Sequence, residues 1–258
     1  MPCIKQSGAE VWFECEGEGL PIILLHGRGG NSISWWRQLA AFQKNYKVVT
    51  LDQRAFGRSK CDAGSFQIQF MVEDILAIMD ILKIDRAVLV CQSMSGIIGM
   101  KLGLSHPERI AGIVLCSTLG GISTPEMRER LRENEAKNKI SLPDRAFAPG
   151  YSVREPELYK LYEKILNSNS GFNPDWQKGL SGKGISILPD ELEGFSVPTI
   201  FIVGSEDMFF PPDMVYQAAS YISHASVIEL EGLGHSPYWE APELFNQILS
   251  DWLIKHQS

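Results

Sequence analysis

The chain has 258 residues, of which 44% are hydrophobic and 21% charged, so it is long enough to bury a large core. Its formal net charge of −7 at pH 7 opposes binding to phosphate backbones and to anionic membrane surfaces. The sequence therefore predicts neither a nucleic-acid partner nor a membrane partner.

Six short apolar segments, dominated by Val, Ile and Leu, are predicted to be β-strands. They cover residues 21–27, 46–53, 86–92, 110–118, 198–204 and 226–232. Continuous apolar runs of this kind are typical of strands that are covered on both faces of a sheet. An earlier segment, residues 9–17, alternates apolar and polar side chains and is predicted to be an antiparallel edge strand.

Helical patterns separate these strands. Residues 66–83, 97–105 and 242–256 carry apolar side chains at helical spacing. The alternation of strands and helices predicts right-handed crossovers between parallel strands. The predicted fold class is therefore α/β, with a mostly parallel sheet and helices on both of its faces.

The segment 119–197 breaks this alternation, because it contains no convincing strand. Thr124 and Pro125 are predicted to start a charged helix that runs to about residue 138, and Pro156 is predicted to start a second helix. The Gly-, Asn- and Ser-rich stretch 168–184 predicts a loop. An ordinary long crossover is the alternative, but connections of this length are usually functional. We therefore expect a helical lid at 119–197, inserted into a core domain of residues 1–118 and 198–258.

Chemically active side chains follow the strands at one edge of the predicted sheet, where open parallel sheets bind their ligands. In VLVCQSMSGIIGM (residues 88–100), Ser93 stands where a strand turns into a helix. Asp207 and His235 follow the last two predicted strands. A serine hydroxyl needs an imidazole to take its proton, and the imidazole needs a carboxylate to orient it. Ser93, Asp207 and His235 are therefore the candidate catalytic triad.

Two backbone N–H groups are the candidate donors for an oxyanion hole. A tetrahedral oxyanion is stabilised by N–H groups that already point at it. Met94 follows the candidate nucleophile at the predicted helix start, and Arg28 lies in the loop HGRGGN after the first apolar strand. We expect the backbone N–H groups of Arg28 and Met94 to face the developing negative charge.

Five segments, taken together and in this order, resemble the α/β-hydrolase superfamily from residue 21 to residue 256. The family order of nucleophile, acid and histidine is similar to that of Ser93, Asp207 and His235. HGRGG (26–30) resembles the oxyanion loop, and DQRAFGRS (52–59) resembles a common Asp-x-Arg-Gly-x-Gly-x-Ser segment. GSED (204–207) and GLGHSPYWEAPELF (232–245) resemble the segments that carry the acid and the histidine. The resemblance implies a sheet of the eight-stranded type and a cofactor-free serine hydrolase.

The turn around the candidate nucleophile departs from the family pattern Gly-x-Ser-x-Gly. Cys91 and Ser95 stand where the family has glycine. Both side chains are small, so the strand and the helix can still pack closely. We expect Cys91 to belong to the strand and Ser95 to the helix, which leaves Ser93 as the nucleophile. The effect of the two substitutions on rate stays open.

Neighbouring polar residues have competing interpretations. Glu206 is the alternative acid, and His26 is better explained as a structural residue of the oxyanion loop than as a catalytic one. Arg54 and Arg58 are expected to make structural contacts near Asp52.

Aromatic residues in these loops and in the lid predict an apolar substrate pocket. The Arg28 side chain is either a contact for a substrate carboxylate or exposed to solvent, and exposure is the favoured interpretation. The residues predicted to line the pocket are Trp35, Trp36, Phe147, Phe172, Trp176, Phe209 and Tyr238.

The predicted function is hydrolysis of a small carboxylic ester, thioester or lactone through an acyl-enzyme on Ser93. The family resemblance leaves open C–C bond hydrolysis, perhydrolysis, a lyase step on the same triad, or a slow-turnover ligand receptor. A haloalkane dehalogenase or an epoxide hydrolase would need aspartate at position 93. The expected partner is a small-molecule substrate, and the chain is expected to be a monomer or a homodimer.

Cysteine and histidine usage bears on cofactors and on the cellular compartment. No His, Cys and Asp cluster has metal-ligand spacing, so neither a metal nor another cofactor is expected. The five cysteines form no CxxC pair, and no apolar run approaches the ~18 residues of a membrane span. No basic start followed by an apolar block is present at the N-terminus. These features favour a soluble protein of the reducing cytoplasm.

Overall fold

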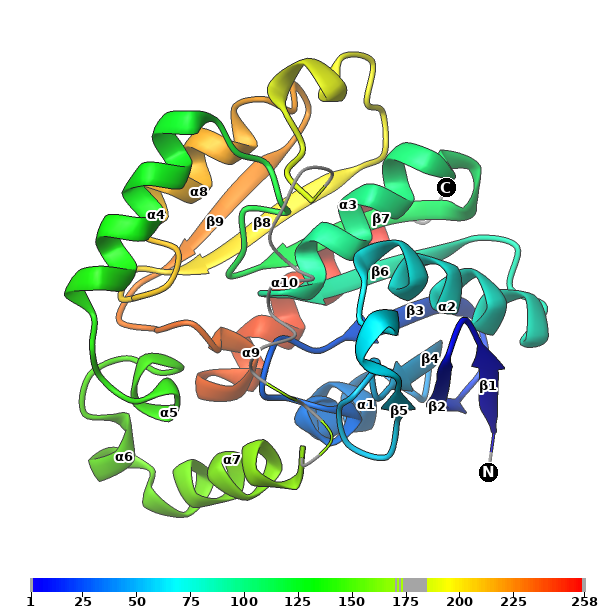
Figure 1. Cartoon of the computed structure of the whole chain (residues 1–258), viewed down its shortest axis with the longest axis horizontal. Coiled ribbons are helices and arrows are strands. Elements are labelled where there is room, and N and C mark those ends of the chain that lie inside the picture. Colours follow the sequence, from blue (N-terminus) through cyan, green and yellow to red (C-terminus); the bar gives the residue numbers. More distant parts are fainter. Residues whose placement is uncertain (1, 170, 172, 174–184, 257–258) are drawn as a thin grey trace.

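The computed structural model describes residues 2–169, 171, 173 and 185–256. A nine-stranded sheet has the order β1-β2-β4-β3-β6-β7-β8-β9, with β5 paired to β2 beside this path (Figure 1). The pairs from β4 to β9 are parallel, and β2 is antiparallel to its partners. The strands are β1 Cys3–Gln6, β2 Ala9–Glu16, β3 Leu20–Leu25, β4 Tyr46–Leu51, β5 Lys60–Cys61, β6 Ala87–Gln92, β7 Ile110–Cys116, β8 Thr199–Gly204 and β9 Ser226–Leu230.

Helices cover both faces of this sheet, as the continuous apolar strands predicted. Ile23 and Leu25 of β3 pack in the hydrophobic cluster that contains α2, α3 and α8. Ile22 and Leu24 point to the other face and pack in the cluster that contains α1 and α10. The α/β fold class is therefore confirmed. These helices are α1 Trp36–Phe42, α2 Ile68–Ile81, α3 Ser95–Ser105, α8 Pro212–Ala219 and α10 Pro242–Lys255.

All six apolar strands are present, each within two residues of its expected ends. The segment at β2 is antiparallel as expected, but its edge position is wrong, because β1 pairs with it and takes the edge. The short strands β1 and β5 and the short helices α1 and α8 were not predicted. Each of them is too short to show a clear repeat of apolar residues.

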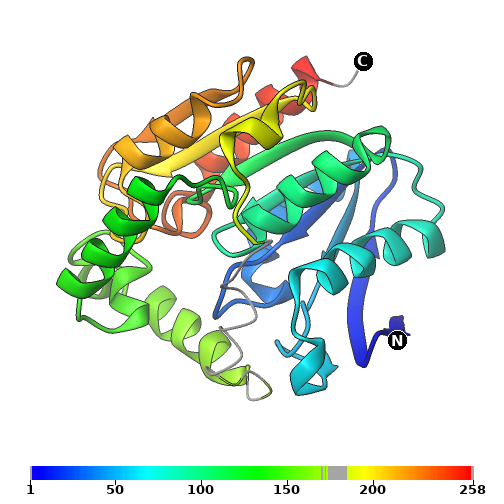
Figure 2. The same ribbon diagram turned by 45° about the horizontal axis from the view of Figure 1, so that its top comes forward.

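Between β7 and β8 the segment 119–197 forms further helices. They are α4 Pro125–Lys137, α5 Leu142–Arg145, α6 Tyr151–Arg154 and α7 Pro156–Ser168. Figures 1 and 2 show α4 to α7 gathered beside one end of the sheet. The hydroxyl of Thr124 accepts the Met127 N–H, and Pro125 takes the first helical position, as expected for a capped helix start. Residues 170, 172 and 174–184 of the predicted loop lie outside the described residues.

The segment 119–197 packs against the core on both sides of the sheet. Tyr162 and Ile165 of α7 join the cluster around α10, whereas Met127 of α4 joins the cluster around α2 and α3. Where the chain enters and leaves the segment, Ile122 and Ile187 form a parallel bridge. In the described part of the chain, no helix combines the length and the apolar character needed to cross a membrane.

Candidate active site

Ser93 occupies a sharp turn between β6 and α3. Its φ of 53° lies in the left-handed region, which a non-glycine residue adopts only where the surrounding structure imposes it. The Ser93 N–H donates to the Cys116 carbonyl at 2.9 Å, and the Gly96 N–H donates to the Ser93 carbonyl at 3.0 Å. These bonds tie the turn to β7 and to the first turn of α3. They hold the hydroxyl at the end of the sheet.

A continuous hydrogen-bonded chain joins Ser93, His235 and Asp207. The Ser93 Oγ lies 2.8 Å from His235 Nε2, and His235 Nδ1 lies 2.9 and 3.0 Å from the two Asp207 oxygens. Because a carboxylate only accepts, Nδ1 carries the proton and Nε2 is free to accept the serine proton. The N–H groups of Phe209 and Phe210 donate to Asp207 Oδ1 at 2.8 and 3.0 Å. The carboxylate is thus fixed from both sides.

Glu206, the alternative acid, does not take this position. Its side chain is exposed to solvent, whereas Asp207 and His235 are both buried. The Asp207 carboxylate contacts the imidazole directly, so the geometry favours Asp207.

The loop that carries His235 is held by two further side chains that the sequence reasoning did not single out. Gln92 Nε2 donates to the His235 carbonyl at 3.2 Å. The Glu240 carboxylate accepts the Gly234 N–H at 2.8 Å and the Ala148 N–H at 3.0 Å. Burial raises the pKa of Glu240 to about 7, against the lowering effect of these two hydrogen bonds. Glu240 therefore links the histidine loop to the segment 119–197.

The two candidate oxyanion donors lie on the same side of the site. Met94 precedes α3 as its N-cap residue, so its N–H has no acceptor one turn earlier in the helix. Arg28 follows β3, and both residues line one cavity with Ser93 and His235. This placement suits an oxyanion on the carbonyl oxygen of a substrate bound next to Ser93, and the role stays a prediction.

The Arg28 side chain is not exposed, contrary to the favoured interpretation. It is half-buried in the wall of that cavity, and burial lowers the pKa of its guanidinium. Tyr162 and Phe209 line the same cavity.

His26 has the structural role that was expected of it. It is fully buried, with Nδ1–H donating to the Gly27 carbonyl at 2.8 Å and Nε2 accepting the Gln53 N–H at 3.0 Å. Burial lowers the pKa of His26 to about 4, so the ring is neutral at pH 7. The neutral ring fastens the loop after β3 to the loop after β4.

The Asp52 carboxylate binds the same loops together. It accepts the Ser32 N–H at 2.8 Å, and the Arg58 N–H and Nε–H at 2.9 Å each. Burial raises the pKa of Asp52, but the hydrogen bonds from Arg58 and Ser32 outweigh it and leave the pKa below its ordinary value. The expected contact of Arg58 with Asp52 is therefore present.

Arg54, two residues after Asp52, also makes structural contacts, and its partner is Asp74 rather than Asp52. Its Nε and Nη2 donate to the two oxygens of Asp74 on α2 at 2.6 and 2.8 Å. Both side chains are buried, so the pair is removed from water. Arg54 also donates to the carbonyls of Gln6, Ser7 and Ser65, which accounts for its three remaining N–H groups.

Cys91 and Ser95, the residues in place of the family glycines, have distinct surroundings. Cys91 is fully buried in β6, and burial raises the pKa of its thiol. Its Sγ lies 2.5 Å from the point that a Cβ on Gly99 would occupy. Ser95 Oγ lies 2.8 Å from the Leu25 carbonyl and 2.9 Å from the Gln92 carbonyl. Ser95 therefore joins the ends of β3 and β6, a role beyond its small size.

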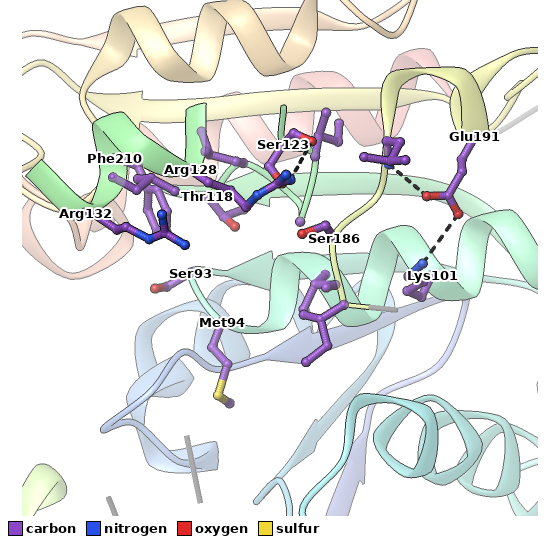
Figure 3. Close-up of a pocket in the computed structure, with 17 residues that line it drawn as sticks. Ser93, Met94, Lys101, Thr118, Ser123, Arg128, Arg132, Ser186, Glu191 and Phe210 are labelled. Atoms are coloured by element: carbon purple, nitrogen blue, oxygen red, sulfur yellow. Dashed lines mark hydrogen bonds and ion pairs between the residues drawn. The ribbon is translucent and has the colours of Figure 1, made fainter. Parts of the chain in front are cut away.

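Two cavities meet at Ser93, Met94 and Phe210. The smaller has a volume of about 350 Å³ and includes His235, Leu142 and Tyr162 in its wall. The larger has a volume of about 880 Å³ and is lined by α3, α4 and the stretches 118–123 and 185–191 (Figure 3). Ser93, the candidate nucleophile, thus has space on two sides.

Most of the aromatic residues predicted to line the pocket lie elsewhere. Phe209 does line the smaller cavity. Trp35 and Tyr238 pack on each other in the core at a centroid distance of 4.4 Å, and Phe147 stacks on Tyr151 at 4.3 Å. Aromatic rings at strand ends therefore fill the core here. Trp36 is 41% exposed, and Phe172 and Trp176 fall outside the described residues.

Known proteins resemble this chain over nearly all of its length. The putative carbamate hydrolase RutD of Azorhizobium caulinodans is 25% identical over 261 residues, which cover 96% of this chain and 97% of RutD. The structure of Est816, described as an N-acyl homoserine lactone degrading enzyme, has a TM-score of 0.82 and 27% identity, covering 97% of this chain and 99% of its own. The enol-lactonase from Burkholderia xenovorans LB400 has a TM-score of 0.82 and 27% identity, covering 98% of this chain and 100% of its own.

The sequence profile of the α/β hydrolase fold matches residues 21–242, which span the core strands, the Ser93 turn and the His235 loop. The chain therefore belongs to the α/β hydrolase fold family.

Proposed function

We propose that the protein is a serine hydrolase that cleaves a small carboxylic ester, thioester or lactone. The observation that carries the proposal is the chain from Ser93 Oγ through His235 to Asp207, which opens on two cavities. Hydrolysis of ester-type bonds also agrees with the enol-lactonase and the lactone-degrading enzyme that resemble this chain.

In the proposed reaction, Ser93 Oγ attacks the substrate carbonyl while His235 Nε2 takes the hydroxyl proton. The backbone N–H groups of Arg28 and Met94 stabilise the oxyanion that forms. His235 then gives its proton to the leaving alcohol or thiol, and an acyl group remains on Ser93. A water molecule, deprotonated by His235, attacks this acyl-enzyme and releases the acid. No step requires a cofactor.

We propose in addition that the segment 119–197 acts as a lid that sets the shape of the substrate. Its residues Leu142 and Tyr162 line the smaller cavity, and Arg128 and Leu131 line the larger one. Each cavity therefore has one wall from this segment and another from the core. A change in the segment changes the space for substrate without touching the triad.

Covalent labelling tests the nucleophile directly. A fluorophosphonate probe followed by peptide mass mapping is expected to label Ser93. The Ser93→Ala protein is expected to take up no label and to hydrolyse no p-nitrophenyl ester, while its unfolding transition stays close to that of the wild type. Ser95→Ala is the matched control and should retain the label. Label on Ser95, or full labelling of Ser93→Ala, would exclude the assignment.

A further inference from the structure

The larger cavity beside Ser93 contains a guanidinium group that the proposed mechanism does not use. Arg128 extends from α4 into this cavity, and Figure 3 shows it beside Ser123, which lies just before the start of the same helix. Its Nη1 lies 3.3 Å from Ser123 Oγ and 3.5 Å from the Ser123 carbonyl, which are long distances for hydrogen bonds. These contacts orient Arg128 but use little of its donor capacity.

The other cations in the wall of this cavity are already paired. Lys101 lies 3.8 Å from Glu191, and Arg132 lies 3.0 Å from Glu129. Around Arg128, by contrast, no Asp or Glu oxygen of residues 2–169 and 185–256 comes within the 4.0 Å of an ion pair. The cavity therefore holds a half-buried cation that makes no direct ion pair with a carboxylate of the described chain; the charge of Arg128 acts on Glu126, an exposed residue of the same helix, only at longer range.

The apolar surroundings of Arg128 strengthen its interaction with an anionic ligand. Ile97, Leu119, Ile122 and Leu131 form apolar parts of the wall. Away from bulk water, a charge-assisted hydrogen bond is stronger than at the surface, and the planar guanidinium matches the two oxygens of a carboxylate. The formal net charge of −7 repels anions from most of the protein, so a local cation is needed to hold one.

The position of His235 indicates which part of the substrate enters this cavity. His235 lines the smaller cavity and is absent from the wall of the larger one. Because His235 must protonate the leaving group, the leaving group lies toward the smaller cavity. The acyl group therefore extends into the larger cavity, where Arg128 stands.

We propose that Arg128 binds a carboxylate at the far end of the acyl group, so that the preferred substrates are monoesters of dicarboxylic acids. This inference rests on the proposed function of Ser93, because the two residues line one cavity. Arg128 acts in substrate binding and makes no contact with the reacting atoms.

Paired substrates with one leaving group test the proposal. The neutral substrate is p-nitrophenyl butyrate, and the anionic ones are the p-nitrophenyl monoesters of succinate, glutarate and adipate. Wild-type protein should favour one of the anionic esters in kcat/KM. Arg128→Gln should lower the ratio of anionic to neutral kcat/KM by about ten- to a hundredfold, mainly through KM, and Arg128→Lys should restore part of it.

Arg130→Gln is the matched control. Arg130 lies on the same helix and loses the same charge, but it pairs with Asp213 and does not line the cavity. Its ratio of anionic to neutral kcat/KM should equal that of the wild type. An unchanged ratio in Arg128→Gln, or an equal fall in Arg130→Gln, would overturn the proposal.

A binding measurement separates this inference from the proposed function. If no ester is hydrolysed in a Ser93-dependent way, the proposed function fails. Even then, isothermal titration calorimetry can measure how tightly monomethyl glutarate binds to the Ser93→Ala protein, and this affinity reports on Arg128. Weaker binding in the Ser93→Ala/Arg128→Gln double variant supports the carboxylate site, and equal binding in both proteins rejects it.

Discussion

The loops at the carboxyl ends of the strands and the segment 119–197 both line the cavities, but they are held in place differently. In the strand-end loops, buried polar groups such as His26, Asp52 and the Arg54–Asp74 pair satisfy one another away from water. The segment is attached at separate points. Asn134 donates to the Met208 carbonyl, Asn169 to the Gly29 carbonyl, and Glu240 accepts from Ala148.

This difference separates the chemistry from the choice of substrate. Removing one member of an interlocked buried set leaves its partner unsatisfied, which lowers the stability of the whole domain. Loosening one attachment of the segment changes a cavity wall and leaves the core packed. We therefore expect changes in the strand-end loops to affect rate or stability strongly, and changes at the attachment points to affect mainly kinetic constants.

The largest expected effect is that of Asp207→Asn on turnover. An amide at this position can present its NH₂ group to His235 Nδ1, which favours the wrong tautomer for accepting the Ser93 proton. We expect kcat to fall on the order of 10⁴-fold, as in the analogous change of a serine protease. Steady-state kinetics with p-nitrophenyl butyrate measure the effect. Glu206→Gln serves as the control, and its kcat should stay near that of the wild type. A large fall in kcat in Glu206→Gln, with little change in Asp207→Asn, would identify Glu206 as the acid of the triad.

The next effect concerns stability. Asp74→Ala leaves the Arg54 guanidinium buried without a carboxylate, and breaking a buried pair in this way costs about 3–5 kcal/mol of unfolding free energy. Asp80→Ala on the same helix breaks the more exposed pair with Arg109 and should cost about 1 kcal/mol or less. Urea unfolding of both variants makes the comparison. Equal losses would show that the strand-end loops do not depend on this pair.

The third effect depends on pH. The folded protein holds the pKa of His26 at about 4, below the ~6.5 of an unfolded chain, so the unfolded chain binds more protons between these values. Stability should therefore fall as the pH is lowered from about 6.5 toward about 4, with His26 contributing about 3 kcal/mol to the loss.

His26→Gln should remove this part of the pH dependence, whereas His106→Gln, at the end of α3, should keep it. Unfolding free energies measured in urea across this pH range give the answer. If the unfolding free energy of His26→Gln falls with decreasing pH as steeply as that of the wild type, other groups cause the acid sensitivity.

The smallest expected effect lies at the attachment of the segment 119–197. In Glu240→Gln, one oxygen can accept from Gly234 or from Ala148, but the NH₂ group cannot replace the second acceptor. We expect kcat/KM to fall about tenfold at alkaline pH, with about 1 kcal/mol of stability lost.

The pH dependence distinguishes this role from a purely structural one. The pKa of Glu240 is raised to about 7, so the carboxylate that accepts both N–H groups is lost as the pH falls through that value. The difference in kcat/KM between wild type and Glu240→Gln should therefore become smaller below about pH 7. Glu243→Gln, an exposed neighbour, is the control. A constant difference at every pH would argue against the proposed link.

The strands and the close approach of Ser93, His235 and Asp207 were predictable because each leaves a local signal. Continuous Val, Ile and Leu runs mark strands buried on both faces, and Ser93, Asp207 and His235 each follow one of them. Asp74 also had a signal, since it shares a helix face with apolar Met71, and a buried acid needs a partner. The identity of that partner, Arg54, depends on tertiary packing.

The pocket was not predictable in the same way. A wall of a substrate cavity and the interior of a core both favour aromatic residues, so composition does not separate them. Trp35 and Tyr238 satisfy the pattern and pack on each other in the core. Arg128 lies in a charge-dense helix where most side chains face solvent, and only the fold shows that it enters a cavity.

The contact between Cys91 and Gly99 also constrains how this sequence can change over evolutionary time. A thiol at position 91 fills the space that any side chain at position 99 would need. We therefore expect a larger side chain at 99 to clash while the cysteine is present, and a change of Cys91 to glycine to relieve that clash. Substitutions at the two positions are therefore expected to be non-additive, with a change at 99 better tolerated once position 91 carries glycine.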